Sequence, residues 1–296
     1  MLTEASQDIQ SINMLNEDNT NEQKAVLDGA QAKLAQLNPL ADLYTSYLMD
    51  SGIKSDVYNG LFCSLDKQQP INNPLSPELP EILESINMYR DRHHFYHWPL
   101  EFPDVFGPDA VGGFSATVGN PPWDIVKPNS QEFFSDYDPK FRSYKKQEAN
   151  RVSKKLMADN PAVAEKWEEY CDGLAEQSAY FKEPLSYSAL GKGDINTFKL
   201  FLEQFFTVLK GGGRMGIVVP SGLYTDQGCQ PLRERFFNRS RVGFIYCFEN
   251  RRAVFNIHRS FKFVLFGAQK AVKPTGSSAP SWSTTRNDCA PRSTPM

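Results

Sequence analysis

The pattern of hydrophobic and polar positions predicts helices in about the first 70 residues of the chain. Apolar residues share one helical face along residues 26–37, and the i, i+3, i+4, i+7 spacing returns along residues 40–48 after an interruption at Pro39. A segment with four prolines, Gln68–Pro80, then predicts a connector. We therefore expect residues 1–78 to form a helical N-terminal region followed by a connector.

Beyond residue 111 the pattern is typical of an α/β fold. Gly112–Gly119 predicts a short strand. A helix beginning at Asn196 or Thr197 is expected to end at the glycines of residues 211–213, before a buried strand, Gly216–Val219. Its expected apolar face consists of Phe198, Phe201, Leu202, Phe205 and Leu209. Helix, glycine turn and strand in this order are typical of a crossover between parallel strands.

Three further segments complete the expected organisation. Val242–Phe248 and Phe261–Phe266 predict two more strands. The polar segment of about residues 129–190 predicts a helical insertion, including Ala162–Leu174. After Lys270 the composition changes to Pro, Ser, Thr and Arg without an apolar face, which predicts a disordered tail over residues 271–296.

The composition indicates a folded chain with a sizeable core. Hydrophobic residues make up 40% of the 296 residues and aromatic residues 12%, which excludes disorder throughout. No stretch approaches ~18 consecutive apolar residues, and the acidic first residues are unlike a signal peptide. Five scattered cysteines without a CxxC pair argue against a disulfide framework or a zinc site. We expect a cytoplasmic protein with no membrane partner.

The formal net charge of −3 conceals a strong asymmetry along the chain. Residues 1–66 carry a balance of −7, whereas residues 140–155 carry +6 and residues 233–259 carry +5. The two basic regions are candidates for binding a polyanion, and Lys145, Lys146, Arg251 and Arg252 are the candidate contacts; solvated helical faces are the alternative. His93, His94 and His97 form a local cluster that lacks the Cys or carboxylate partners of a metal site, so no metal is expected.

The tetrad Asn120-Pro121-Pro122-Trp123 follows the first predicted strand, and ligands bind at the carboxyl ends of strands in α/β sheets. The prolines restrict the backbone and carry no N–H donors. The Asn120 side chain and the Pro121 main chain therefore offer neighbouring carbonyl acceptors, and Trp123 adds a flat apolar surface. This combination suits an amino group on an aromatic ring, such as N6 of adenine. A rigid proline turn beside a buried Trp is the alternative.

Four blocks of sequence carry a resemblance to a known family. They are HWPLEFPDVF (His97–Phe106), GFSATVGNPPW (Gly113–Trp123), DINTFKLFLEQFFTVLKGGGRMGIVVPSGL (Asp194–Leu223) and VFNIHRSFKFVLF (Val254–Phe266). In this order they resemble the adenine-N6 DNA methyltransferases of Type IIG restriction–modification and BREX-type phage-defence systems, over about residues 40–270. The resemblance implies a partial Rossmann-like methyltransferase sheet, with residues 79–270 forming the base-binding half of the catalytic domain.

The resemblance also implies roles for single residues. The family flips adenine out of double-stranded DNA, and Asn120 Oδ1 and the Pro121 carbonyl accept hydrogen bonds from N6, while S-adenosyl-L-methionine supplies the methyl group. Trp123 stacks on the base, and Phe255 aligns with a second stacking aromatic, although core packing is an equal alternative for Phe255. Asp194 and Asn196 match positions near the cofactor, although Asn196 can also be a helix cap. No Pro-Cys nucleophile is present.

The chain departs from this family at both ends. Nothing in Met1–Trp98 matches the Gly-x-Gly cofactor motif that precedes NPPW in the family, and no long target-recognition domain follows the last predicted strand. We therefore expect a fragment that is inactive alone, and a partner chain that carries the cofactor motif. A protein or rRNA N-methyltransferase with the same acceptors and a non-catalytic remnant or subunit are the alternatives.

Overall fold

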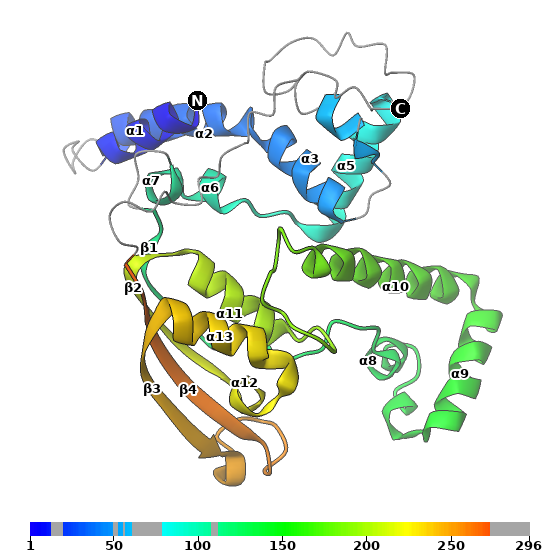
Figure 1. The fold of residues 1–296 in the computed structure, drawn as a ribbon. Coiled ribbons are helices and arrows are strands. Elements are labelled where there is room, and N and C mark those ends of the chain that lie inside the picture. Colours follow the sequence, from blue (N-terminus) through cyan, green and yellow to red (C-terminus); the bar gives the residue numbers. More distant parts are fainter. Residues whose placement is uncertain (13–19, 50–52, 56, 61–78, 108–111, 273–296) are drawn as a thin grey trace, which may run out of the picture.

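The computed structural model describes residues 1–12, 20–49, 53–55, 57–60, 79–107 and 112–272. In these residues the chain is mixed α/β, with N-terminal helices, a helical arm, and a four-stranded sheet with helices on one face (Figure 1). No helix in the described part of the chain is both long and apolar enough for a membrane span.

The predicted helical region, residues 1–78, contains α1 (Leu2–Ile12), α2 (Thr20–Ala35) and α3 (Asn38–Leu48) in its described part. Three further helices, α5 (Leu79–His93), α6 (Trp98–Glu101) and α7 (Pro103–Phe106), precede the sheet, and the sequence did not predict them. The predicted interruption at Pro39 is the start of α3, where proline is tolerated in the first turn. Leu79 and Pro80 begin α5 instead of ending a connector, and residues 68–78 of that predicted connector lie outside the described residues.

The sheet contains β1 (Phe114–Gly119), β2 (Leu209–Pro220), β3 (Ser240–Glu249) and β4 (Lys262–Lys270), and all four were predicted. Their order is β1-β2-β4-β3. β1 and β2 are parallel and are joined through α11 (Thr197–Thr207), which confirms the predicted crossover. β4 is antiparallel to β2 and to β3, so the sheet is mixed rather than wholly parallel.

Helices α11 and α13 (Gln230–Arg239) cover one face of the sheet, with the short elements α12 (Gly222–Thr225), η2 (Gln227–Cys229) and η3 (Asn250–Arg252) near its end (Figure 1). The main core lies between these helices and the strands. Its fully buried side chains include Leu202, Val219, Leu232 and Val264. The core is therefore built from one apolar face of each helix and alternate residues of each strand.

The predicted apolar face of α11 and its predicted end were partly wrong. The helix ends at Thr207, and Leu209 is a buried residue of β2. Phe201 is 38% exposed, and Phe206 occupies the core instead. Leu209 also satisfies the helical spacing, so periodicity alone could not assign it to the strand. The glycines of residues 211–213 form an irregularity inside β2, where Gly212 has φ +81°, instead of a turn between helix and strand.

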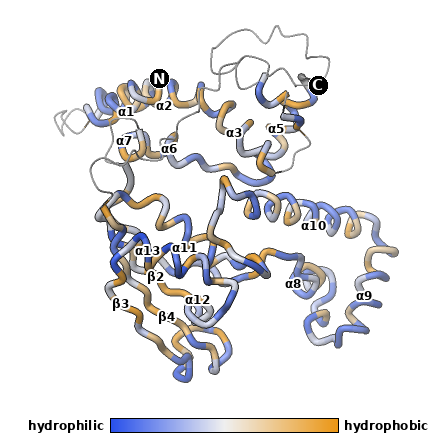
Figure 2. Tube along the Cα trace, in the orientation of Figure 1, coloured by the Kyte–Doolittle hydropathy of each residue, from blue (hydrophilic) through white to orange (hydrophobic). Residues whose placement is uncertain are grey.

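The predicted insertion is a helical arm, which contains α8 (Ser130–Ser135), η1 (Phe141–Ser143), α9 (Lys146–Asp159) and α10 (Pro161–Lys182). It has a core of its own around Phe134, Phe141 and Val163. The side chains of Asn129 and Asn160 cap α8 and α10. Figure 2 shows that α9 is mostly hydrophilic, whereas the strands are largely hydrophobic.

The two edges of the sheet differ in how far they are protected. Edge strand β3 carries charged residues and has an irregular register near Gly243, features that discourage further pairing. Among the described strands, edge strand β1 pairs with β2 alone; it has no charged residue and exposes 82% of Val118. On the face opposite the helices, Phe244, Tyr246 and Phe248 are also exposed. The β1 edge is therefore open to another strand.

The predicted disordered tail lies outside the described residues, apart from Ala271 and Val272.

A buried ion pair holds α13 against α11. Glu203 Oε1 lies 2.8 Å from Arg235 Nη1, and the carboxylate also accepts hydrogen bonds from the N–H groups of Ser188 and Ala189, at 2.8 and 3.0 Å. The Glu203 side chain is only 4% exposed. Removing one partner of such a pair leaves the other charge buried without compensation, which costs about 3–5 kcal/mol.

We expect Glu203→Leu to lower the free energy of unfolding by about 3–5 kcal/mol, because it leaves Arg235 and two N–H groups without their acceptor. Urea unfolding of the full chain measures this change. Glu234→Leu on the exposed side of α13 is the control, with an expected change within about 0.5 kcal/mol. Equal effects of the two substitutions would contradict the assigned role of the pair.

Candidate active site

The carboxyl ends of β1, β2 and β3 lie at the same edge of the sheet, because these three strands point in one direction. They are followed by Asn120, Ser221 and Asn250, respectively. Ligands of open α/β sheets bind at this kind of edge. The predicted tetrad and Phe255 both follow strands that end here, which makes this edge the candidate site.

The loop that follows β1 leaves two acceptors unused. Asn120 is exposed, and neither its side chain nor the Pro121 carbonyl receives a hydrogen bond from the residues that the structure describes. The next two carbonyls are occupied: Pro122 accepts from Thr197 Oγ1 at 2.7 Å and Trp123 accepts from Asn196 Nδ2 at 3.1 Å. The free acceptors are thus the pair that the sequence analysis selected.

The N-terminus of α11 holds this loop in place. Asn196 Oδ1 accepts a hydrogen bond from the Phe198 N–H and caps the helix, as the alternative interpretation of Asn196 predicts. Thr197 Oγ1 bridges the Pro122 carbonyl and the Asp124 N–H, at 2.7 and 3.0 Å. In the sequence Thr197 is only a candidate cap, because its bridge to the loop joins segments that are distant along the chain.

Gly119 allows a close approach just before the tetrad. A Cβ at this position would come within 3.0 Å of the Phe205 ring of α11. Glycine therefore allows the end of β1 and the helix to approach closely, which helps to fix where Asn120 leaves the sheet.

Trp123 and Phe255 lie together at the site but do not form a slot for a base. Their ring centroids are 5.7 Å apart with an angle of 64° between the planes, an edge-to-face contact. A base stacked between them needs two roughly parallel rings, one on each of its faces. The loop that carries Phe255 is held by the fully buried Asn250, whose side chain bonds to both the N–H and the carbonyl of Phe255 at 3.0 Å.

The indole Nε1 of Trp123 is buried and has no hydrogen-bond partner among the described residues. An unsatisfied buried donor costs about 1–3 kcal/mol, so this N–H favours an acceptor from a bound molecule or from a rearrangement of the site. It was not visible in the sequence, where Trp123 was considered only as a stacking surface.

The two predicted cofactor residues do not form a cradle for S-adenosyl-L-methionine. Asp194 is exposed, and its carboxylate lies 3.2 Å from Lys127 Nζ. Both polar atoms of the Asn196 side chain are engaged in the cap and the loop. The described residues before β1 are helices and connections without a strand–turn–helix unit. The part of the chain that the structure describes therefore does not fit this cofactor by itself.

Two titratable side chains near this end of the sheet, Tyr224 and Cys229, have raised pKa values. A hydrogen bond to Cys247, with smaller effects of burial and charge, raises the pKa of Tyr224 in α12. Burial raises the pKa of the Cys229 thiol, which lies in the main core. The raised pKa values keep the Tyr224 phenol and the Cys229 thiol protonated at neutral pH, so neither is an anionic nucleophile.

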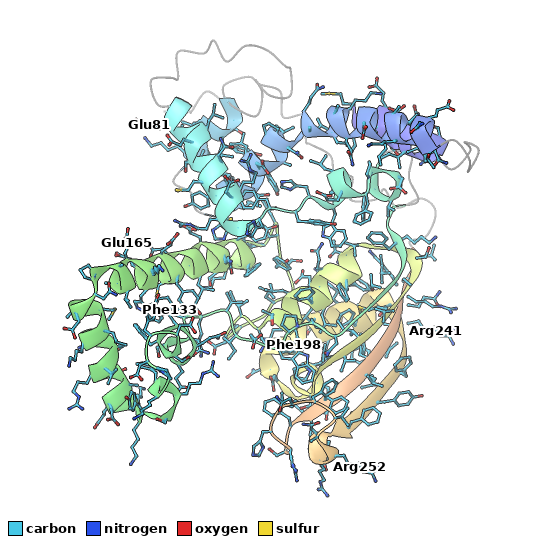
Figure 3. All side chains as sticks on the ribbon, turned by 180° about the vertical axis from the view of Figure 1, so that it is seen from behind. Glu81, Phe133, Glu165, Phe198, Arg241 and Arg252 are labelled. Atoms are coloured by element: carbon cyan, nitrogen blue, oxygen red, sulfur yellow. The ribbon has the colours of Figure 1, made fainter. Side chains whose placement is uncertain are left out.

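The structure separates the predicted DNA contacts into two places. Lys145 and Lys146 are exposed at the start of α9 and form no ion pair with the described residues. Arg251 and Arg252 lie in η3, which directly follows β3 at the carboxyl end of that strand, and Figure 3 labels Arg252. Arg251 Nε lies 2.6 Å from Glu249 Oε2, so its charge is partly compensated.

The histidine cluster joins helices. His93 Nε2 lies 2.7 Å from Glu176 of α10, and His97 Nε2 lies 2.8 Å from Asp42 of α3. Within the described ranges, no three His, Cys, Asp or Glu side chains are grouped so as to hold a metal ion.

No protein-family model matches the chain, and no curated protein matches it in sequence. The functional interpretation therefore depends on the geometry of the loop after β1 and on the motifs in the sequence.

We expect Thr197→Val to loosen the loop of residues 120–126, because it removes the hydroxyl that bridges Pro122 and Asp124. Losing these bonds costs about 1–3 kcal/mol, which corresponds to roughly ten- to hundredfold faster local amide exchange. Hydrogen-exchange mass spectrometry measures this rate. Thr197→Ser keeps the hydroxyl and is expected to retain protection; equal exchange in the two variants would contradict the role of the bridge.

Proposed function

We propose that the chain contributes the base-binding part of a site-specific DNA adenine-N6 methyltransferase of a restriction–modification or phage-defence system. The observation that supports this proposal most strongly is the pair of unused acceptors, Asn120 Oδ1 and the Pro121 carbonyl, beside Trp123 at the carboxyl end of β1. We interpret the four strands as part of a Rossmann-like methyltransferase sheet.

The chemistry of the acceptors suits the amino group of adenine. N6 carries two N–H donors, and Asn120 and Pro121 accept one each, which fixes the direction of the nitrogen lone pair. Trp123 stacks on the flipped base, a contact worth about 1–3 kcal/mol in other base–aromatic pairs. Opening the contact between Trp123 and Phe255 accompanies entry of the base, since these rings now touch edge to face.

S-adenosyl-L-methionine is the proposed methyl donor, and we propose that a separately encoded chain supplies most of its binding site. The open edge of β1 supports this assignment, because an unguarded strand without charge can accept further strands beside the tetrad. The absence of a cofactor cradle among the described residues points in the same direction.

Two alternatives have their own support. The same acceptors fit the primary amide of a glutamine or an amine in rRNA, which gives a protein or rRNA N-methyltransferase. The direct contact of Trp123 with Phe255, which leaves no slot for a base, favours a non-catalytic remnant or subunit.

Base recognition can be measured without cofactor. We expect the chain to bind an oligonucleotide with unpaired adenine more tightly than one with N6,N6-dimethyladenine, by about 1–3 kcal/mol, because the second base has no N6 donors. Asn120→Ala is expected to remove most of this difference, whereas Asn238→Ala on the exposed side of α13 is expected to leave it unchanged. Equal affinity of the wild-type chain for both oligonucleotides would contradict adenine-N6 recognition.

Methyl transfer is tested by co-expressing the chain with the reading frame immediately upstream and sequencing the host DNA by a single-molecule method. We expect N6-methyladenine at a defined site, and its loss in Asn120→Ala. The purified chain alone is expected to be inactive and to show no S-adenosyl-L-methionine binding by calorimetry. Unmodified DNA together with methylated glutamine or rRNA would favour the first alternative, and no methylation of any target would favour the second.

A further inference from the structure

Seven basic side chains lie on one part of the helical arm and define what we call its basic face. They are Lys140, Arg142, Lys145, Lys146, Arg151, Lys154 and Lys155. All seven are exposed, and none forms an ion pair with the residues that the structure describes. From the sequence, residues 140–155 are a candidate region for binding a polyanion, with Lys145 and Lys146 as candidate contacts.

Many cations elsewhere in the chain have an acidic partner. Lys33 pairs with Asp8, Arg92 with Glu176, and Arg235 with Glu203, at distances of 2.7 to 2.9 Å. Lys127 and Lys262 also lie near carboxylates. The charge of the basic face therefore stays uncompensated, with Glu148 as the one acidic residue among residues 140–155.

Charge is separated within the arm. The exposed surface of α10 carries Glu165, Glu168, Glu169 and Asp172 against two exposed lysines, Lys166 and Lys182, whereas the basic face occupies η1, α9 and the residues just before them. In Figure 3, Glu165 lies on the outer side of α10 and Phe133 on the side that faces the arm's core. A polyanion is thus attracted to one side of the arm and repelled from the other.

The arm presents these charges on a rigid support. Phe134 lies 5.2 Å from Phe141 and 4.9 Å from Trp167 between ring centroids, and these residues pack beneath the apolar side of α9. Tyr144 OH donates to Asp138 at 3.0 Å, which fixes the turn before α9. Fixed cations lose less conformational freedom on binding than cations in a loose loop.

The arm begins only a short connection after the candidate site. Trp123 is followed by the bridge between Ile125 and Asn196, and Asn129 then caps α8. In Figure 1, α8 lies between α9 and the sheet, so a duplex bound along the arm can extend toward the two free acceptors.

We propose that the basic face of the arm binds the phosphate backbone of double-stranded DNA and anchors it beside the candidate site. The choice of DNA rests on the proposed function, whereas the exposed basic side chains of the arm by themselves indicate a polyanion. Phosphate contacts position a duplex without reading its sequence. They also make affinity depend on salt, with a slope of about 0.9 per neutralised phosphate.

The test compares two variants of the full chain with the same total charge. The first removes four cations of the basic face, as Lys146→Gln, Arg151→Gln, Lys154→Gln and Lys155→Gln. The control removes four exposed lysines elsewhere, as Lys24→Gln, Lys54→Gln, Lys166→Gln and Lys182→Gln. Fluorescence anisotropy with a short labelled DNA duplex, without cofactor, measures affinity between about 50 and 200 mM salt. Circular dichroism and urea unfolding verify that both variants fold.

We expect the first variant to bind the duplex at least about tenfold more weakly than wild type and to lower the salt slope by about 3. The control is expected to change both quantities much less. Equal weakening in the two variants, or no duplex binding by the wild-type chain, would overturn the proposal. Preference for polyglutamate over duplex DNA would also overturn it and assign the face to an acidic protein.

These outcomes are separable from those of the methylation test. Arm-dependent duplex binding without any adenine recognition would refute the proposed function and leave the inference standing. If the first variant still discriminates adenine and binds the duplex as tightly as wild type, the proposed function stands and the inference about the arm is refuted.

Discussion

The hydrogen bonds between the N-terminus of α11 and the loop after β1 are the interaction on which the candidate site depends. Asn196 and Thr197 engage the carbonyls of Pro122 and Trp123 and the N–H of Asp124. Because prolines at positions 121 and 122 have no N–H to offer, the loop cannot satisfy itself through a regular turn. The helix end supplies those bonds and leaves Asn120 and Pro121 as the free acceptors.

Packing of the sheet then decides what surrounds these acceptors. Phe255 approaches Trp123 because Asn250, buried at the end of β3, holds the following loop in a fixed conformation. The open edge of β1 leaves the opposite side of the tetrad without a neighbouring strand. Among the described residues, helix α11 and the loop after β3 therefore support the tetrad on one side, whereas no strand lies beside β1 on the other.

The distribution of charge separates the regions proposed to bind DNA from the acidic parts of the molecule. The negative formal charge of the whole chain says little about its partners, because acidic and basic residues are segregated. On the arm, compact aromatic packing holds seven cations apart from the acidic surface of α10. At η3, by contrast, Glu249 compensates Arg251, so a cluster of similar size in the sequence offers fewer free charges.

The sequence by itself determined the kinds of elements and the candidate acceptors. Alternating and continuous apolar runs predicted all four strands, and helical spacing predicted the N-terminal helices and the insertion, since burial of one face imposes that period. The sequence could not assign Leu209, because a buried residue at this position fits both the preceding helix and the following strand. It also did not predict that β4 lies between β2 and β3 and is antiparallel to both. Only the tertiary structure decided which polar atoms are free: the bridge of Thr197, the pairing of Arg251 and the unpartnered Nε1 of Trp123 all depend on segments distant in the chain. Local sequence encodes what a residue can bind, whereas long-range contacts determine whether that capacity is already used.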